Sequence, residues 1–388
     1  MATKLRQLCE AGQSPWIDSI TRALIRSGDL QRLVERGVRG LTANPTIFER
    51  AIIGSADYDA AIGALAADGA GSARIYEELL LDDIRDAADV LRPVYDQSGG
   101  ADGYASIEVS PALADDTQAT IAEARRYARA VGHPNVFVKV PATDAGIPAI
   151  RQLIGEGINV NITLIFAIES YERVMDAYLG GLEQLVADGQ PLNRVASVAS
   201  FFVSRVDGAV DRRLGALLQV EQDPERRGEM ERLLGNAAIA NARIAYQRFL
   251  STFSGERFEA LRRQGAHVQR PLWASTSTKN PRDRDVMYVE ELIGPDTVTT
   301  MPPATIEAFE DHGRIARTID HDVAEAYGTI RMLQELGISM KDVTDTLQVE
   351  GVQLFAASLD RLDRSIREKG DAQRARRDTG TITRTVRV

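Results

Sequence analysis

A single lysine lies within a run of apolar residues that is typical of a buried β-strand. Lys139 follows Val136-Phe137-Val138 and precedes Val140-Pro141, and strands of this composition are buried on both faces in parallel sheets. Burial disfavours the ammonium form of a lysine, and a neutral amine can attack a carbonyl carbon to form a Schiff base. A structural lysine paired with a buried carboxylate explains the same residues equally well, so the run alone leaves both interpretations open.

Two carboxylates interrupt other apolar runs in the same way. Asp18 follows Trp16-Ile17, and Glu108 lies between Ile107 and Val109. Carboxylates are rarely buried completely without a partner. Like Lys139, both residues lie near the ends of their predicted strands, which is where functional residues gather in α/β barrels.

Polar and apolar residues alternate in two further segments, which predicts strands with one polar face. One such polar residue is most often a satisfied core group. Polar residues at several strand ends beside a buried lysine favour a functional site instead. The polar members of these segments are Asn159, Asn161, Thr163, Thr42 and Asn44.

A phosphate ligand would need fixed hydrogen-bond donors, and three candidates follow the late strands. Arg205 comes after the sixth predicted strand, and Ser275 and Lys279 lie at and after the seventh. TIM barrels often bind phosphate near their last strands. Each signal is weak alone, because an arginine at a strand end is more often a surface ion pair.

These residues require a scaffold that brings strand ends together. Eight strand-like runs alternate with amphipathic helical segments, which predicts a single-domain α/β protein with a TIM (β/α)8 barrel, extra helices and a C-terminal helical extension. We expect the barrel domain to occupy residues 1–360 and a charged, mobile tail to occupy 361–388. The predicted strands are 14–20, 39–44, 104–110, 135–142, 158–166, 195–204, 270–276 and 296–302.

Composition limits the classes of partner. The chain has 388 residues and a formal net charge of −10, so it repels nucleic acid and anionic membrane surfaces except at local cationic sites. Neither a secretory signal nor a membrane-spanning run is present in the sequence, so we expect a cytoplasmic protein. Cys9 is the only cysteine, and the four histidines are scattered, so we expect no metal site.

Several long segments, in one order, resemble the transaldolase family. The resemblance runs from about Ser14 to the helices near residue 360. It implies a Schiff-base enzyme of the pentose phosphate pathway that uses sugar phosphates and no cofactor. The segments are GLTANPTIFERAI, SIEVSP, NVFVKVPAT, EGINVNITLIF, SVASFFVSRVD, LWASTSTKNP and DVMYVEELIGPDTVTTMPP.

The resemblance also implies roles for individual residues. Lys139 matches the Schiff-base lysine, Glu108 the acid/base that acts through a water, and Asp18 the residue that takes the C4 hydroxyl proton of the ketose. The remaining matches bind substrate. Asn44 and Asn161 match residues that hold the intermediate, Thr42, Thr163 and Ser200 lie around them, and Arg205 and Ser275 match the phosphate pocket.

The sequence departs from the better-known branch of the family at one position. That branch has an arginine two residues after the serine that matches Ser275, whereas this chain has Ser277 there. The nearest cation is Lys279, and we hypothesise that it replaces the arginine.

The sequence leaves three alternatives open. An aldolase of the same superfamily would release free dihydroxyacetone to water instead of transferring it to an aldehyde. A pyridoxal-phosphate barrel would also use a Schiff-base lysine, although we would expect that lysine near the first strand. A non-catalytic sugar-phosphate-binding barrel would leave the buried Lys139 unexplained. A homodimer is common among soluble enzymes, but no segment indicates an interface.

Overall fold

Eight parallel strands form a closed barrel in the computed structural model, which describes residues 2–385 and the side chains of residues 2–375. Each strand pairs with the next along the chain, and the eighth pairs with the first. This topology confirms the expected TIM barrel, and every strand overlaps its predicted segment. The strands are β1 (Gln13–Asp18), β2 (Gly40–Thr42), β3 (Tyr104–Glu108), β4 (Val136–Pro141), β5 (Val160–Ile165), β6 (Ser197–Phe202), β7 (Arg270–Ala274) and β8 (Thr297–Met301).

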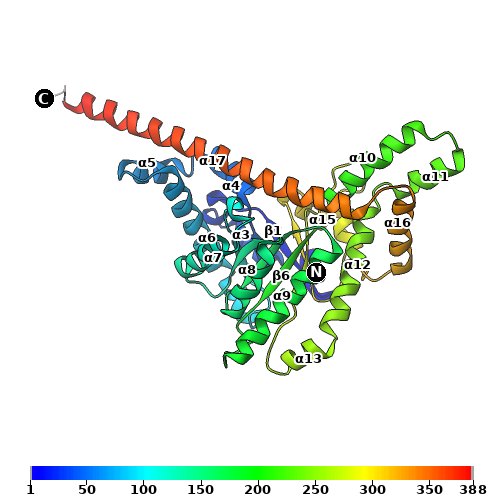
Figure 1. The fold of residues 1–388 in the computed structure, drawn as a ribbon. Coiled ribbons are helices and arrows are strands. Elements are labelled where there is room, and N and C mark those ends of the chain that lie inside the picture. The colour runs from blue at the N-terminus through cyan, green and yellow to red at the C-terminus, as the bar shows by residue number, and fades with distance from the viewer. Residues whose placement is uncertain (1, 386–388) are drawn as a thin grey trace.

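Helices surround the barrel and bury apolar stripes against it (Figure 1). In the helix after β4, for example, Ala149, Ile150, Leu153 and Ile154 are buried at the spacing of one helical face. The helices are α1 (Lys4–Glu10), α2 (Arg22–Arg26), α3 (Asp29–Arg36), α4 (Pro45–Ile53), α5 (Asp59–Ala67), α6 (Ser72–Gln97), η1 (Pro111–Leu113), α7 (Thr117–Val131), α8 (Gly146–Gly155), α9 (Ile168–Ala187), α10 (Ser204–Val220), α11 (Pro224–Leu233), α12 (Ala237–Phe253), α13 (Glu256–Arg262), α14 (Met287–Glu291), α15 (Pro303–His312), α16 (Val323–Glu335) and α17 (Met340–Thr385).

The strand register brings polar residues to the same level of the barrel. Glu108 of β3 pairs with Lys139 of β4, and Lys139 pairs in turn with Asn161 of β5. On the other side, Asp18 of β1 pairs with Thr42 of β2. Glu108, Asp18 and Thr42 are the last residues of their strands and Lys139 is in the carboxyl-terminal half of β4, towards the end of the barrel where active sites of this fold form. Asn161, in contrast, is the second residue of β5 and reaches the same level through its pairing with Lys139.

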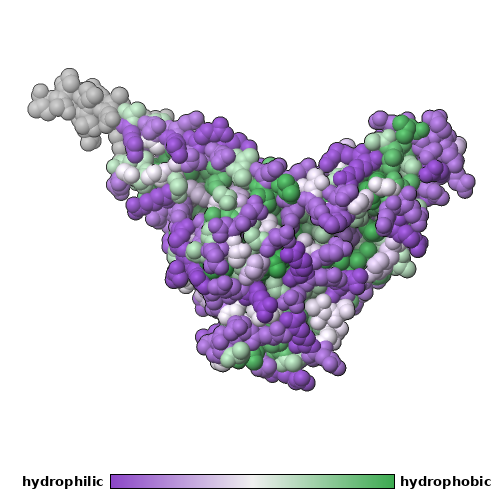
Figure 2. Space-filling view, viewed as in Figure 1, coloured by the Kyte–Doolittle hydropathy of each residue, from purple (hydrophilic) through white to green (hydrophobic). Residues whose placement is uncertain are grey.

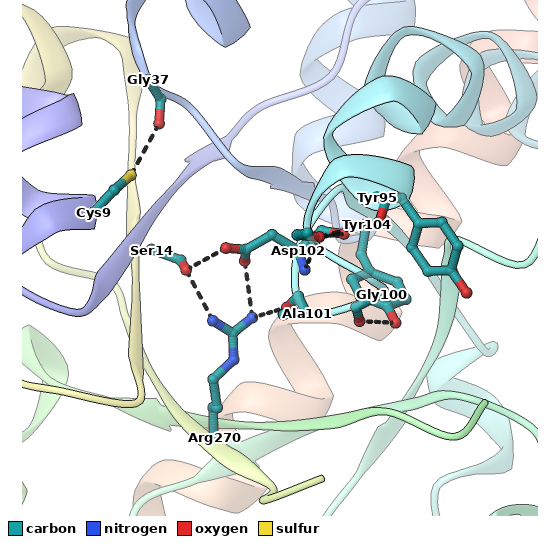
Figure 3. Close-up of polar contacts among 10 residues, drawn as sticks. Cys9, Ser14, Gly37, Tyr95, Gly100, Ala101, Asp102, Tyr104 and Arg270 are labelled. Atoms are coloured by element: carbon teal, nitrogen blue, oxygen red, sulfur yellow. Dashed lines mark hydrogen bonds and ion pairs between the residues drawn. The ribbon is translucent and has the colours of Figure 1, made fainter. Parts of the chain in front are cut away.

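A separate polar cluster closes the amino-terminal end of the barrel (Figure 3). Arg270, the first residue of β7, donates hydrogen bonds to Ser14 Oγ at 2.8 Å and to the carbonyl oxygen of Ala101 at 2.6 Å. Its guanidinium also lies 2.9 Å from the carboxylate of Asp102, and Ser14 donates to the same carboxylate at 2.7 Å. These contacts join β1, β7 and the loop before β3 at the end remote from Lys139, so they have a structural role.

The last helix, α17, is longer than any other and extends past the barrel (Figure 1). The domain boundary expected at residue 360 lies within it. Arg361 donates to Glu49 of α4 at 2.9 Å, and Lys369 lies 2.7 Å from Asp59 of α5. The helix therefore continues along α4 and α5 beyond residue 360, and the mobility expected for 361–388 stays a prediction; residues 386–388 lie outside the described part of the chain.

The visible surface is mostly hydrophilic, with apolar side chains gathered on the arm formed by α10 and α11 (Figure 2). Val220, at the end of α10, is 71% exposed. Among residues 2–385 we find no helix with the length and apolar character needed to cross a membrane. The exposed residues do not identify a partner surface, and the homodimer stays a prediction.

Candidate active site

Lys139 and Glu108 form a buried ion pair inside the barrel. Lys139 Nζ lies 3.1 Å from Glu108 Oε2 and donates a hydrogen bond to the carbonyl oxygen of Ala43 at 3.2 Å. Lys139 is only 4% exposed. Burial raises the pKa of Glu108, and the positive charge of Lys139 opposes that rise. Glu108 is therefore the buried carboxylate with which a purely structural lysine would pair. Lys139 also lines a cavity, however, as expected for a lysine that reacts with a ligand.

Asp18 lines the same cavity from β1. Burial raises the pKa of its carboxyl group, while the charges of Lys139, Lys279, Arg205 and Arg50 counteract that rise. A carboxyl group with a raised pKa beside a lysine is suited to moving protons near neutral pH. The barrel thus contains two buried carboxyl groups, Glu108 and Asp18, on the strands around the Lys139 amine, and different cations surround each of them.

The cavity at the carboxyl end of the barrel encloses about 420 Å³ of empty space, including its open mouth. Most of the predicted site residues contribute to its wall. Glu108, Asn161, Thr163 and Lys279 are not part of that wall. The wall is formed by Asp18, Thr42, Asn44, Lys139, Ser200, Phe202, Arg205, Leu272, Ala274, Ser275 and Thr300.

Asn161 is fixed behind the cavity wall by two hydrogen bonds. Ser200 Oγ donates to Asn161 Oδ1 at 2.7 Å, and Asn161 Nδ2 donates to Ser106 Oγ at 3.1 Å. Thr42 Oγ1 and Thr163 Oγ1 are buried and have no hydrogen-bond partner among the residues that the structure describes, which is unusual for buried hydroxyl groups. The site therefore holds one oriented amide and two hydroxyl groups that a polar ligand could engage.

Two of the predicted polar residues have additional or different local roles. Asn44 is the N-cap of α4, where its Oδ1 accepts a hydrogen bond from Ile47 N at 3.0 Å. Asn159 lies before β5, where it donates to the carbonyl oxygen of Pro134 at 2.9 Å and accepts from Ala196 N at 2.9 Å. Asn159 thus ties loops at the amino-terminal end and does not join the site.

Three cations lie around the cavity. The charges of Arg205 and Arg50 both lower the pKa of Lys279, after the larger effect of its burial. Within residues 2–375 none of the three has an ion-pair partner, although Arg205 lies over the Phe202 ring at 5.5 Å and Lys279 donates to Ser277 Oγ at 2.7 Å. Cations that are left unneutralised at one place favour an anionic ligand.

Ser275 connects this cationic region to the start of α10. Its φ of 59° is in the left-handed region, which is costly for a residue other than glycine. Its hydroxyl lies 2.9 Å from Ser204 Oγ, and its carbonyl oxygen accepts from Ser204 N at 3.2 Å. These contacts hold Ser275 next to the start of α10, which carries Arg205, and the assignment of both residues to a phosphate pocket stays a prediction.

Asp207 anchors the helix that carries Arg205. Asp207 Oδ1 accepts a hydrogen bond from Ala238 N at 2.7 Å, and Oδ2 accepts one from the Tyr288 hydroxyl at 2.8 Å. Burial raises the pKa of Asp207 to about 7, and the charges of Asp211 and Asp283 add to that rise. Asp207 thus joins α10 to α12 and α14 with a carboxyl group that titrates near neutral pH.

This raised pKa predicts a pH-dependent stability. Between about pH 4 and pH 7 the folded state binds more protons at Asp207 than the unfolded state does, so the free energy of unfolding falls as pH rises. The full effect is at most ~4 kcal/mol, because one pKa unit corresponds to ~1.4 kcal/mol. Asp207→Asn cannot ionise, its Oδ1 can still accept from Ala238 N, and its Nδ2 can donate to the Tyr288 hydroxyl oxygen, so its denaturation curves should lack this component. Equal pH slopes for the two proteins would contradict the assignment.

Sequence reasoning missed three polar residues of the site. Arg50 lies on α4, and in the sequence it is indistinguishable from an ordinary residue on a helix surface. Ser106 has no distinctive neighbour in sequence, but its position two residues before Glu108 on the same strand face could have suggested it. Thr300 is similarly hidden in the run Thr297-Val298-Thr299-Thr300-Met301, and it lines the cavity from β8.

The fold and site together define a TIM barrel with a lysine-centred pocket and a cationic mouth. The sequence pattern of the transaldolase/fructose-6-phosphate aldolase family matches residues 15–366. The chain therefore belongs to this family, which confirms the resemblance drawn from the motifs.

Full-length relatives support the same assignment. A protein named Transaldolase 2 from a Nostoc species is 48% identical over 369 residues, covering 94% of this chain and 97% of the relative. A transaldolase of a Parafrankia species is 48% identical over 371 residues, covering 95% and 98% of the two chains. A transaldolase of Acidothermus cellulolyticus is 47% identical over 382 residues, covering 98% and 100%.

Proposed function

We propose that this protein is a transaldolase, a transferase that carries a dihydroxyacetone unit from a ketose phosphate to an aldose phosphate. The donor is sedoheptulose 7-phosphate or fructose 6-phosphate, and the acceptor is glyceraldehyde 3-phosphate or erythrose 4-phosphate. The main support is the buried Lys139, which lies 3.1 Å from Glu108 and shares its cavity with Asp18. The names of the similar proteins support the same reaction, and we place that reaction in the pentose phosphate pathway.

The reaction begins with attack of the Lys139 amine on the C2 carbonyl of the ketose. The carbonyl oxygen takes up a proton, and the resulting carbinolamine loses water to form a Schiff base. Glu108 is the nearest carboxyl group to the amine, and through a water it would accept the proton released by the amine and return a proton to the departing hydroxyl. Its raised pKa allows it to act in both directions.

The C3–C4 bond then breaks while the substrate is attached to Lys139. Asp18 takes the proton of the C4 hydroxyl, C4 becomes the aldehyde of the departing aldose, and the bonding electrons move into the Schiff base to give an enamine. An acceptor aldehyde reverses these steps, with Asp18 returning the proton. Asn161 and Asn44 would hold the hydroxyl groups of the three-carbon unit, with Thr42, Thr163 and Ser200 around them.

The cations around the cavity mouth suit the phosphate group of the substrate. Arg205 and Ser275 line the cavity, and Lys279 and Arg50 lie within electrostatic range of Asp18. A phosphate dianion would neutralise charges that have no carboxylate partner in the described residues. We assign Lys279 the place of the arginine found in the better-known branch of the family.

The assignment of Lys279 predicts a selective loss of phosphate affinity. In Lys279→Ala, the KM for fructose 6-phosphate should rise about 10-fold, equivalent to ~1.4 kcal/mol, because one cation is removed from the phosphate site. The kcat should change little, because Lys279 does not contact Lys139. Arg282→Ala is the matched control, since Arg282 is an exposed cation of the same loop. An unchanged KM in the Lys279 variant would exclude the assignment.

Borohydride trapping tests the proposed function directly. The protein is incubated with fructose 6-phosphate, reduced with borohydride and digested for peptide mass spectrometry. A reduced three-carbon adduct on the Lys139 peptide is expected, and it should disappear when erythrose 4-phosphate is added before reduction. No adduct in folded protein would refute Schiff-base chemistry at Lys139.

A fructose 6-phosphate aldolase activity is the second candidate, because the family description includes it. Such an enzyme would also form the adduct on Lys139. It differs in releasing dihydroxyacetone steadily when no acceptor aldehyde is present. A transaldolase instead retains the three-carbon unit on the lysine. Release of one aldose molecule per enzyme molecule, without continuing release of dihydroxyacetone, therefore supports the transferase.

A further inference from the structure

Strand β5 contains a bulge next to the proposed site. Its register with β6 advances from Ile162↔Ala199 to Ile165↔Phe201, so β5 has one extra residue over this stretch. Leu164, within the bulge, has a φ of 57° and is 1% exposed. A branched residue in the left-handed region is strained and persists only where its surroundings hold it.

Two residues of α17 hold Leu164 in this conformation. Gln348 Nε2 donates hydrogen bonds to the carbonyl oxygens of Leu164, at 3.2 Å, and Ala142, at 3.0 Å. One helical turn further on, Gly351 lies against the Leu164 side chain, where a Cβ atom would be 2.7 Å from Leu164 Cδ2. Helix α17 thus contacts both the backbone and the side chain of Leu164.

The same contacts reach the residues around Lys139. Ala142 N donates to the carbonyl oxygen of Thr163 at 2.8 Å, so Gln348 joins the ends of β4 and β5 where they are already paired. Thr163 precedes Leu164 directly, and Lys139 and Asn161 are register partners two residues before Pro141 and Thr163. A change in the bulge would therefore move the Thr163 hydroxyl relative to the amine.

Further contacts fix α17 along its length. Ser358 Oγ lies 2.8 Å from Thr46 Oγ1, and Arg361 pairs with Glu49. Both partners are on α4, the helix that Asn44 caps at the cavity wall. The carboxyl ends of β2, β4 and β5 are therefore braced by one helix.

We infer that α17 is part of the active-site scaffold, with Gln348 and Gly351 as positioning residues that hold the β5 bulge and thereby set Thr163 and Asn161 against Lys139. This inference rests on the proposed function. It assigns a role to the C-terminal extension. Without the contacts of α17, Leu164 would relax from its strained conformation, and Thr163 and Asn161 would move relative to Lys139.

Gln348→Met tests the hydrogen bonds, because methionine has a similar length and no donor. The kcat for fructose 6-phosphate and erythrose 4-phosphate should fall on the order of 10- to 100-fold, as expected for a small displacement of positioned groups. The KM should change less, because the phosphate residues are on other elements. Gln353→Met is the matched control on the exposed side of α17. Equal kcat values for the two variants would overturn the inference.

Leu164→Gly provides the rescue experiment, because glycine adopts a positive φ without strain. Gln348→Met/Leu164→Gly should recover most of the kcat lost in Gln348→Met, even though losing the leucine side chain lowers the melting temperature. Failure to recover would mean that Gln348 acts only through general stability, and the inference would be withdrawn.

Gly351→Ala gives an independent variant should Gln348→Met not fold. It should lower kcat in the wild-type background, where the new Cβ meets Leu164, and have little effect in the Leu164→Gly background. Equal effects in both backgrounds would overturn the inference. Borohydride trapping separates the two proposals: no adduct in the wild-type protein refutes the proposed function, whereas a normal adduct with no kcat loss in the variants refutes only the role of α17.

Discussion

The Lys139→Met protein is expected to lose transfer activity by on the order of 10⁴- to 10⁶-fold, the loss seen when a covalent nucleophile is removed. Methionine fills a similar volume in the barrel but has no amine to attack the ketose carbonyl. The adduct found after borohydride reduction should disappear with the activity. Steady-state rates with fructose 6-phosphate and erythrose 4-phosphate, together with peptide mass spectrometry, measure both effects.

The buried partner of the lysine determines how this variant must be controlled. Without Lys139, Glu108 loses the charge that lies 3.1 Å away, and a lone buried carboxylate is destabilising unless it takes up a proton. Lys139→Met/Glu108→Gln removes that charge and serves as a folded inactive protein. Lys341→Met is the activity control, because Lys341 is exposed on α17. Substantial activity in Lys139→Met, with a new adduct elsewhere, would contradict the assigned nucleophile.

The fold was predictable from sequence because parallel barrels combine two strong local signals. Apolar runs such as Val136-Phe137-Val138 end at turn formers such as Pro141, and helices with a single apolar face separate the runs. Strand ends were less accurate by a few residues, since pairing geometry decides them. Lys139, Asp18 and Glu108 were predictable as a group because charged residues are rare in buried strands.

The remaining parts of the site depend on contacts between residues that are distant in sequence. Gln348 meets Ala142 and Leu164 across about two hundred residues, and nothing near Gln348 distinguishes it from other polar helix residues. The bulge at Leu164 is equally hidden, because leucine gives no sign of a positive φ. Arg50 becomes a site residue only because α4 begins at the cavity wall.

The end of α17 illustrates a different limit of sequence interpretation. From Arg367 onward the sequence loses the apolar periodicity that predicts a packed helix, and this loss underlies the prediction of a charged, mobile tail over 361–388. In the structure the helix continues, with Leu362 and Ile366 buried, and polar contacts attach its later part: Lys369 pairs with Asp59, and Arg374 Nε donates to the carbonyl oxygen of Ala66 at 3.0 Å. Arginine and lysine are also good helix formers. Long side chains thus make contacts that an apolar pattern does not reveal, while the mobility of the segment stays a prediction.

Asp18→Asn is expected to separate Schiff-base formation from carbon–carbon bond cleavage. Asparagine keeps the shape of the side chain but cannot take the C4 hydroxyl proton, so kcat should fall by about 10²- to 10⁴-fold, the usual contribution of a general base. The Lys139 adduct should still form, and it should carry the intact ketose phosphate rather than the three-carbon unit. Glu108→Gln is the contrasting variant, because it should slow the appearance of any adduct.

The pH dependence of the two variants distinguishes their roles further. Burial raises the pKa of Asp18, and the cleavage step needs its ionised form, so kcat should decline on the acid side at a pH above the ordinary range of an aspartate. Asp18→Asn should lack this decline, whereas a variant at the phosphate site such as Lys279→Ala should keep it. If Asp18→Asn instead accumulated the three-carbon adduct at the wild-type rate, bond cleavage would not depend on Asp18.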